Sequence, residues 1–440
     1  MGIKVAKFGG SSVADGIQLE KMRQIITKDS DRRFIVVSAP GKRYETDNKI
    51  TDLLYLCKTH MEHNLPYDQI FQVIVDRFMA VKINLDITVD LLTHFDTIRE
   101  ELKNNPSADY LASRGEFLTG ILVAAFLKYD FIDAAELVKF DSNGKFLMEE
   151  TDEAISSELA KHERAVIPGF YGAMPDGSIK TFPRGGSDIT GALVARAIKA
   201  DVYENWTDVS GFLMADPRIV DNPKPIHTIS YKELRELSYM GASVLHEDAI
   251  YPARMANVPI NIRNTNVPDD PGTLITGDSD NPRNDDGQII TGIAGNKDFT
   301  VVALYKNMMS GQKGFVRRIL GILDDFNINF EHLPSGIDTV SVVMSNKSID
   351  GRLDEIIDAF RGRLQPDSIE VFGDISMIAT VGQRMTYRPG VSATLFKALA
   401  DANINVRMID QGSSEINIIV GVENKDFENA IRAIYNAFVQ

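Results

Sequence analysis

A glycine-rich segment carries the residues with the clearest potential for chemistry. Arg184-Gly185-Gly186-Ser187-Asp188 precedes an Ala-rich run, Ile189 to Ala200, which predicts a helix capped by Ser187 or Asp188. Free N–H groups at a helix N-terminus suit an anion, and an arginine fork binds carboxylate or phosphate. An aspartate at this place repels an anion unless it holds a cation. On this stretch alone, an anion site and a plain turn before a capped helix are equally compatible.

A second glycine segment lies at the N-terminus. Lys7 precedes Gly9, Gly10, Ser11 and Ser12 at a predicted strand-to-helix turn. A lysine beside free backbone N–H groups predicts a phosphate cradle. The alternative is a lysine at the end of a strand, followed by a turn needed only for packing. The Gly-Lys-Ser/Thr ending of a P-loop is absent, so the pattern alone leaves both interpretations open.

Other charged residues stand at positions that suit ligand contacts. Thr207 and Asp208 follow a predicted strand ending in Trp206, and Arg218 adds a cation soon afterwards. Arg114 and Glu116 interrupt an apolar helical stretch. For these two, a solvated helix face is as good an interpretation as a site.

The elements that must position these residues alternate between strands and helices. The first 40 residues follow the order strand, glycine loop, helix, strand, and helices fill residues 50–129. This order predicts a parallel α/β sheet with ligands at the carboxyl ends of its strands. A polar loop at residues 41–49 is predicted to be mobile. Further strands are expected at 165–172, 201–206 and 258–264, and a helical block at 231–257.

The C-terminal region differs from the rest and contains a repeat. Residues 266–288 are polar, with three prolines and many Asp and Asn, and mark a domain boundary. Beyond it, residues 314–330 and 390–406 align without gaps at an offset of 76, and 341–344 align with 417–420 at the same offset. Each unit predicts strand, helix, Asn turn, strand and hairpin partner, so the repeat indicates paired small βαββ domains.

Composition excludes several classes of protein. Lys and Arg number 47 against 62 Asp and Glu, a formal net charge of −15, which argues against a nucleic-acid surface. The single cysteine, Cys57, offers neither an internal disulfide nor a metal cluster, which favours a reducing compartment. No signal-peptide pattern opens the chain, and the longest apolar run, residues 119–127, is too short to span a bilayer. We therefore expect a cytoplasmic protein without nucleic-acid or membrane partners.

Five motifs, taken together and in order, resemble those of aspartokinases in the amino-acid kinase superfamily. The match extends over nearly the whole chain, and the repeat resembles the tandem ACT domains of that family. The motifs are Lys7-Phe8-Gly9-Gly10-Ser11-Ser12-Val13, Arg114-Gly115-Glu116, Arg184-Gly185-Gly186-Ser187-Asp188, Trp206-Thr207-Asp208-Val209 and Asp216-Pro217-Arg218.

The resemblance implies a fold and a domain division. Residues 1–288 are expected to form an α/β/α sandwich with a mainly parallel sheet, of which 266–288 are linker-like. Two ferredoxin-like ACT domains are expected at 289–372 and 373–440, with an exchange of strands between them left open.

The resemblance also implies an activity. The family transfers phosphate from MgATP to the side-chain carboxylate of L-aspartate, giving 4-phospho-L-aspartate, the first step towards lysine, threonine and methionine. The implied catalytic residues are Lys7 and Asp188, and no direct protein ligand for Mg²⁺ is implied. Asp188 is expected to bind the cations that neutralise the phosphates, Lys7 among them. The implied phosphate and ATP contacts are Lys7, Gly9, Gly10, Ser11, Gly186, Ser187, Thr207, Asp208 and Arg218. The implied aspartate contacts are Ser38, Thr51, Glu116, which binds the ammonium, and Arg184, which binds the α-carboxylate.

Regulation follows from the same resemblance. ACT pairs in the family bind lysine or threonine between domains or subunits, and homodimers or homotetramers form through them. A repeat that only dimerises is the alternative. The effector region implied here comprises Met309, Gly314, Phe315, Val316, Glu331, Ser335, Asp338 and Thr339.

Two departures from the family pattern concern the nucleotide, and two rival functions remain. Ser243 stands where many relatives carry a nucleotide-contacting lysine, and Leu213 replaces a frequent aromatic residue. One rival is an amino-acid kinase acting on glutamate, acetylglutamate or carbamate. The other is a catalytically silent amino-acid sensor. Because the chain ends with the second repeat, the monofunctional type is expected rather than a homoserine dehydrogenase fusion.

Overall fold

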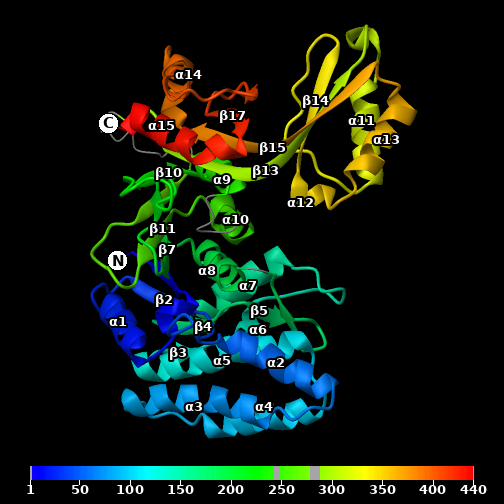
Figure 1. Cartoon of the computed structure of the whole chain (residues 1–440). Coiled ribbons are helices and arrows are strands. Elements are labelled where there is room, and N and C mark those ends of the chain that lie inside the picture. Colours follow the sequence, from blue (N-terminus) through cyan, green and yellow to red (C-terminus); the bar gives the residue numbers. More distant parts are fainter. Residues whose placement is uncertain (1, 184, 242–246, 278–287, 440) are drawn as a thin grey trace. The chain divides into compact units, whose positions relative to one another are not determined.

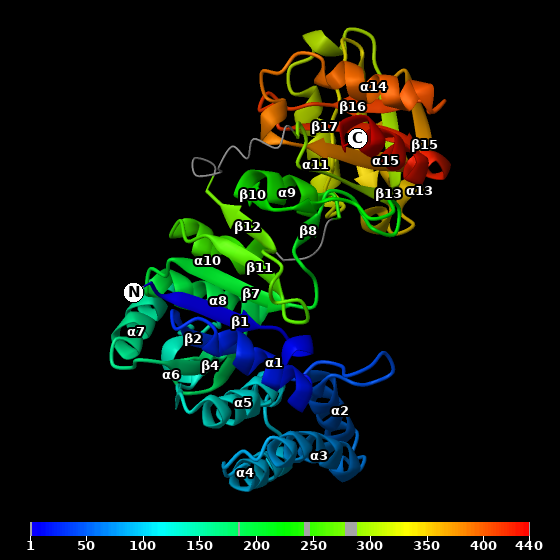
Figure 2. The same ribbon diagram turned by 90° about the vertical axis from the view of Figure 1, so that its left-hand side faces the viewer.

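The chain folds into two compact units, which are drawn in Figure 1 and Figure 2. The computed structural model describes residues 2–183, 185–241, 247–277 and 288–439. Two short stretches of the N-terminal region, 213–224 and 232–241, group with residues 288–439 in the second unit. The remaining described residues up to 277 form the first unit.

The first unit is built on an eight-stranded sheet in the order β10-β12-β11-β7-β1-β2-β4-β3. Every neighbouring pair is parallel except β11 and β12. The predicted mainly parallel sheet is thus confirmed, and the strands β1, β2, β4, β7 and β11 end at one edge. The strands are β1 (Lys4–Phe8), β2 (Arg32–Val37), β3 (Asp130–Phe131), β4 (Ala165–Pro168), β7 (Val202–Thr207), β10 (Thr228–Ser230), β11 (Ile260–Asn264) and β12 (Thr273–Thr276).

Helices cover both faces of this sheet. On one face lie α1 and α5, with α2, α3 and α4 adding to the same apolar core, and on the other lies α8, flanked by α7 and α10 (Figure 1). The helices are α1 (Gly16–Thr27), α2 (Ile50–Glu62), α3 (Asp68–Asn84), α4 (Leu92–Lys103), α5 (Ala108–Leu127), α6 (Ala134–Leu137), α7 (Met148–Leu159), α8 (Gly186–Ala197) and α10 (Glu247–Met255).

Helix α5 has an apolar sequence because most of it is buried in the first unit. It is long and apolar enough to cross a membrane by length and composition, but two thirds of that stretch is buried inside the fold. Its residues Leu111, Leu118 and Leu122 lie in the core against α2, α3 and the sheet. The apolar character therefore follows from packing between helices and sheet.

Short elements complete the first unit and refine the expected ones. The predicted strand at 165–172 divides into β4 and β5, and the helical block at 231–257 divides into α9 and α10. Within the polar stretch 266–288, β12 pairs between β10 and β11. The short elements are η1 (Gly10–Val13), β5 (Tyr171–Ala173), β6 (Ile179–Thr181), β8 (Phe212–Leu213), which reaches into the second unit, and β9 (Pro225–Ile226).

The second unit contains a five-stranded antiparallel sheet in the order β14-β13-β15-β17-β16. β13 (Gly292–Tyr305) and β15 (Ser368–Val381) pair along their 14-residue lengths, with a bulge after Asn296. The first half of β13 extends the sheet of β17 and β16, and its second half pairs with β14. The other elements are α9 (Tyr231–Tyr239), η2 (Met309–Gly311), α11 (Phe315–Asp325), β14 (Thr339–Ser345), α12 (Asn346–Ile349), α13 (Leu353–Leu364), η3 (Gln383–Met385), α14 (Val391–Asp401), β16 (Met408–Asp410), β17 (Asn417–Glu423), η4 (Asn424–Asp426) and α15 (Phe427–Val439).

The sequence repeat corresponds to a structural repeat. Helices α11 and α14 begin and end at equivalent positions, and each follows a glycine in the left-handed region, Gly314 at φ 77° and Gly390 at φ 94°. The turns after the helices repeat too, with Asn327 at φ 53° and Asn403 at φ 56°. A side chain is strained at such φ values, and Gly and Asn adopt them most readily. Shared backbone geometry thus explains why these residues recur.

Candidate active site

Lys7 and Asp188 meet at the carboxyl edge of the parallel sheet. Lys7 lies on β1 with its side chain buried, and its Nζ is 2.5 Å from Asp188 Oδ1 at the start of α8. Asn205, opposite Lys7 on β7, donates from Nδ2 to Asp188 Oδ1 at 2.9 Å and places its Oδ1 3.4 Å from Lys7 Nζ. The predicted contact between Lys7 and Asp188 is present. Asn205 completes the group, and the strand register brings it there.

The glycine loop after β1 is held close to the loop after β2. The N–H of Gly9 donates to Trp206 O at 2.9 Å, and the N–H of Gly41 donates to Gly10 O at 2.8 Å. A Cβ on Gly41 would lie 2.7 Å from the carbonyl carbon of Gly10, and one on Gly10 would lie 2.9 Å from Ala39 O. Only glycine permits this approach of two backbones. The loop that would face a phosphate is therefore fixed in place from both sides.

The start of α8 corrects one sequence prediction. Gly185, in the left-handed region at φ 75°, is the residue that precedes the helix, and no side chain caps it. Ser187 and Asp188 lie inside the first turn, so the prediction that one of them caps the helix is wrong. Thr190 Oγ1 accepts from the N–H of Phe170 at 3.0 Å and fastens the turn to the loop after β4. Because Asp188 does not cap the helix, its carboxylate binds Lys7. Arg184 lies outside the described residues.

Glu116 is a buried carboxylate with an unused oxygen. It lies on α5, and its Oε2 has no hydrogen-bond partner. Burial raises the pKa of Glu116 to about 8, against the smaller opposing effects of the Ala39 backbone, Arg114 and Lys7. A buried acceptor without a donor is costly, so an ammonium group supplied by a ligand would satisfy it.

Arg114 belongs to the core of the first unit rather than to a solvated helix face. Its side chain is buried, and its guanidinium lies over the rings of Phe117, Tyr110 and Tyr171 at 4.4, 4.6 and 5.6 Å. It also donates to Ser113 Oγ at 2.8 Å. The solvated-face interpretation is therefore wrong for this part of α5. Stacking of the guanidinium on three rings fixes the helix turn that carries Glu116.

The remaining predicted aspartate contacts, Ser38 and Thr51, lie in segments that pack against the turn of α5 carrying Glu116. Ser38 follows β2, and its N–H donates to Phe8 O at 3.1 Å. Thr51 lies in the first turn of α2, and both side chains are half-buried. A Cβ on Gly115 would lie 2.7 Å from Ala39 Cβ and 3.3 Å from Ile50 Cγ2. The loop after β2 and the start of α2 are thus packed directly against the turn of α5 that carries Glu116.

The predicted nucleotide contacts divide between the two units. Thr207 ends β7, and its Oγ1 lies 3.2 Å from Asp208 Oδ1, at the same sheet edge as Lys7. Arg218 belongs to the second unit, where its guanidinium binds Asp216 at 2.6 Å and remains exposed. Its contact with a nucleotide stays a prediction, and Ser243 lies outside the described residues.

The predicted effector region lies in the second unit. Met309 and Phe315 are buried in the core of α11, α13 and β14, whereas Val316 is exposed. Glu331 accepts a hydrogen bond from the hydroxyl of Tyr239 at the end of α9, which leaves its role in binding an effector as a prediction. The turn at 335–339 is closed by Gly336 N–H donating to Thr339 O at 2.7 Å. Of the effector residues implied by the resemblance, Met309 and Phe315 therefore pack in the core of the second unit.

Comparison with known proteins identifies the family. Residues 2–264 match the model of the amino acid kinase family, and residues 378–438 match an ACT domain model. Aspartokinase 3 of Bacillus subtilis is 36% identical over 455 aligned positions, covering 99% of this chain and 98% of that protein. The chain belongs to the aspartokinase family. A bifunctional aspartokinase/homoserine dehydrogenase of maize is 30% identical, but the chain spans only half of it.

Solved aspartokinase structures have the same fold. The aspartate kinase of Clostridium acetobutylicum superposes over the full length of both chains with a TM-score of 0.91 and 50% identity. Aspartokinase III of E. coli in complex with lysine and aspartate superposes with a TM-score of 0.72 and 25% identity, again over both full chains. The two-part aspartokinase architecture is thus shared along the whole chain.

Proposed function

We propose that the protein transfers the γ-phosphoryl group of MgATP to the side-chain carboxylate of L-aspartate, giving 4-phospho-L-aspartate. This is the first step of lysine, threonine and methionine biosynthesis, and we place it in the cytoplasm. The observation that carries the proposal is the Lys7–Asp188–Asn205 group beside a tightly held glycine loop, in a chain of the aspartokinase family.

The chemistry asks little of an acid or a base. A carboxylate is already a nucleophile at neutral pH, so the barrier arises from bringing an anion against a polyanion. Catalysis then consists of positioning and charge neutralisation. Lys7 Nζ supplies the positive charge at the transferring phosphate, and Asp188 with Asn205 fixes where that charge lies. The glycine loop supplies backbone N–H donors.

Mg²⁺ would arrive with the phosphates of ATP and neutralise their charge. Among the described residues, no group of three or more metal-ligating side chains is present. Mg²⁺ commonly binds through substrate phosphates with one or two carboxylates and water. Asp188, which binds Lys7, and Asp208, which lies beside Thr207 at the end of β7, are two carboxylates at this edge of the sheet. We assign neither of them as a direct ligand. Gly186, Ser187, Thr207, Asp208 and Arg218 are proposed to contact the nucleotide.

Aspartate recognition is proposed to use opposite charges at its two ends. The free Oε2 of Glu116 would accept the ammonium group, and Arg184 would bind the α-carboxylate. Ser38 and Thr51 border this pocket. An amino acid with a misplaced group would leave a buried charge unpaired, which produces strong discrimination. The aspartate present in the E. coli aspartokinase III structure supports this substrate.

Replacing Arg184 with alanine is expected to raise the KM for aspartate by about 10-fold to 100-fold, because a charged hydrogen bond to the substrate is lost. The turnover number should change much less, since the α-carboxylate takes no part in the transfer. Steady-state kinetics with aspartate varied at saturating MgATP measure both constants. A fall in turnover with unchanged KM would contradict this role.

The reaction itself is tested by ADP release from MgATP in the presence of aspartate or glutamate. We expect ADP release to depend on aspartate. With glutamate, which is one methylene longer, kcat/KM should be at least about 100-fold lower. Faster release with glutamate would favour another amino-acid kinase. No release with either, from folded protein, would favour a silent sensor.

The second unit is proposed to regulate the first. Three side chains on one face of α9 bind three parts of the ACT region: Glu233 Oε1 accepts from Thr291 Oγ1 at 2.6 Å, Glu236 Oε2 accepts from Asn417 Nδ2 at 2.5 Å, and Tyr239 binds Glu331. The spacing of three places these side chains on one helix face. Movement of the ACT strands would therefore carry α9 with them.

Lysine, threonine or both are expected to inhibit, with at least about tenfold loss of activity at millimolar concentration. The motivation is the duplicated ACT fold and the lysine present in the E. coli aspartokinase III structure. ADP release is measured with each amino acid alone and with both together. Unchanged activity under all three conditions would leave the ACT pair only its proposed role in forming a homodimer or homotetramer.

A further inference from the structure

The loop of residues 41–49 is anchored, although its polar sequence predicts mobility. Its ends are tied by two backbone bonds: Gly41 N–H donates to Gly10 O at 2.8 Å, and Ile50 N–H donates to Pro40 O at 3.1 Å. Inside the loop, Arg43 binds the buried Asp47 through Nε at 2.8 Å and Nη2 at 3.0 Å. The loop joins Ser38 and the glycine-loop contact to the first turn of α2, which carries Thr51.

The strongest anchor comes from Arg77 on α3, a helix that carries no predicted site residue. Arg77 is only 7% exposed. Its Nη2 donates to Gly41 O at 2.7 Å and lies 3.5 Å from Ala14 O, and its Nη1 donates to Asn48 O at 2.6 Å. Nη1 also lies 3.7 Å from Asp47 Oδ2. One guanidinium therefore binds both ends of the loop and the end of η1.

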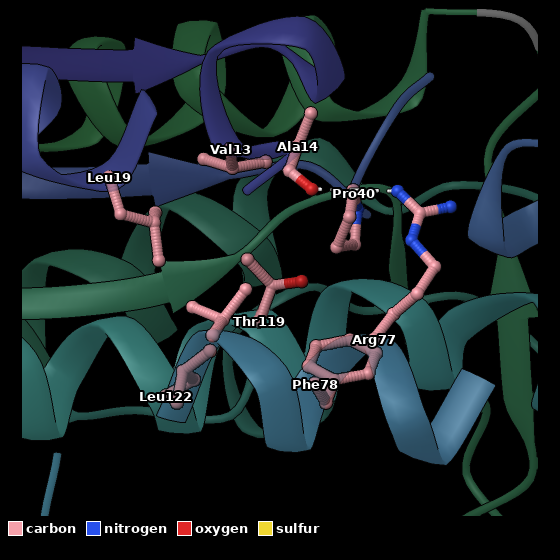
Figure 3. Close-up of a pocket in the computed structure, with 9 residues that line it drawn as sticks. Val13, Ala14, Leu19, Pro40, Arg77, Phe78, Thr119 and Leu122 are labelled. Carbon is pink, nitrogen blue, oxygen red and sulfur yellow. Dashed lines mark hydrogen bonds between the residues drawn. The ribbon is translucent and has the colours of Figure 1, made fainter. Parts of the chain in front are cut away.

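The surroundings of Arg77 show that its position serves these contacts. The guanidinium lies beside a small space of about 10 Å³. Figure 3 shows it at one end of this space, with Val13, Leu19, Phe78 and Leu122 along the other walls. Such a space holds at most about one water molecule. The Nε of Arg77 is buried without a partner. The shortest contacts of this buried cation go to the loop carbonyls of Gly41 and Asn48, while its Nε stays unpaired, so the loop determines where the guanidinium lies.

We propose that Arg77 is a positioning residue for phosphoryl transfer. It locks the 41–49 loop against the glycine loop, so that the phosphate cradle and the aspartate pocket keep a fixed separation. This inference rests on the proposed aspartate pocket at Ser38, Thr51 and Glu116. A planar fork with several donors is needed because the carbonyls it binds point from different segments. Displacements of about 1 Å far from the reacting atoms are known to cost about 100-fold in rate.

The test compares Arg77→Met and Arg77→Lys with the wild type. For Arg77→Met we expect backbone amides in residues 41–50 to exchange hydrogen about tenfold faster or more. We also expect kcat/KM for aspartate to fall by about 10-fold to 100-fold. Arg77→Lys, which offers a single ammonium nitrogen instead of a planar fork, should lie between the two. It also serves as the readout if the methionine variant fails to fold.

The matched control is Arg99→Met. Arg99 lies on α4 in the same helical layer, stacks on Phe71 and binds Asp96, and touches neither loop. It should leave both the exchange of residues 41–50 and the kinetics unchanged. Unchanged exchange in the folded Arg77 variants overturns the proposal, as does faster exchange with wild-type kinetics. Because exchange needs no substrate, it still tests Arg77 if the wild type shows no aspartate-dependent ADP release, a result that would instead overturn the proposed function.

Discussion

Replacing Lys7 with alanine is expected to lower the turnover number by roughly 10²-fold to 10³-fold, the usual cost of losing a group aimed at developing charge. The KM for aspartate should change by less than about threefold, because Lys7 acts on the transferring phosphate and Glu116 on the amino acid. Steady-state kinetics with each substrate varied in turn separate the two constants.

The control for this variant is Lys4→Ala. Lys4 lies on the same strand and forms an ion pair with Asp29 at 2.7 Å, away from Asp188. It tests whether loss of a lysine from β1 is enough to reduce activity through the fold. Similar losses in both variants, or a Lys7→Ala effect confined to the aspartate KM, would contradict the role assigned to Lys7.

The second large effect is expected at Glu116. Replacement by glutamine should raise the KM for aspartate by about 10-fold to 100-fold, because a charged hydrogen bond to the ammonium group becomes a neutral one. Glu100→Gln on α4, where the carboxylate binds Lys103 on the surface, is the control and should leave the KM unchanged. An unchanged aspartate KM in Glu116→Gln would remove Glu116 from the pocket.

The pH dependence gives Glu116 a second signature. Since burial raises its pKa to about 8, most molecules of the free enzyme carry the neutral acid at pH 7. An ammonium group binds the ionised form, so kcat/KM for aspartate in the wild type should rise with pH and level off above about 8. The rise should be absent from the Glu116→Gln profile. A flat wild-type profile between pH 6 and 9 would contradict this assignment.

The free energy of unfolding should also depend on the ionisation of Glu116. It should fall as pH rises, whereas kcat/KM should rise. A folded-state pKa above the unfolded value gives stability that is fully present below the unfolded pKa and is lost as pH rises through about 8. The Tm of Glu116→Gln relative to the Tm of the wild type should therefore increase between pH 5 and pH 9.

Local patterns in the sequence were sufficient for the elements around the glycine loop and for the repeat. The β1-loop-α1-β2 order and the left-handed Gly314 and Gly390 follow from backbone preferences that a few neighbouring residues express. The Lys7–Asp188 contact was predictable because an aspartate beside an anion site needs a cation, and because the family resemblance places both residues in one site. Predicting this contact needed no long-range information beyond the expectation that both glycine loops lie at the same edge of the sheet.

Other features depend on which distant segments pack together, and local patterns do not carry that information. Asn205 joins the site only through the register of β7 against β1. Arg77 and Arg114 look like solvated charges in helices, because burial of an arginine is decided by carbonyls and rings contributed from elsewhere. The assignment of residues 213–224 and 232–241 to the second unit is likewise a property of tertiary packing.

The central claim is that phosphate is transferred to the side-chain carboxylate of aspartate, and trapping the product tests it most directly. An acyl phosphate reacts with hydroxylamine to give a hydroxamate at the carbon that carried the phosphate. The protein incubated with MgATP, L-aspartate and hydroxylamine should yield the β-hydroxamate of aspartate, in amounts equal to the ADP formed. Formation of the α-hydroxamate, or ADP without any hydroxamate, would contradict the proposed reaction.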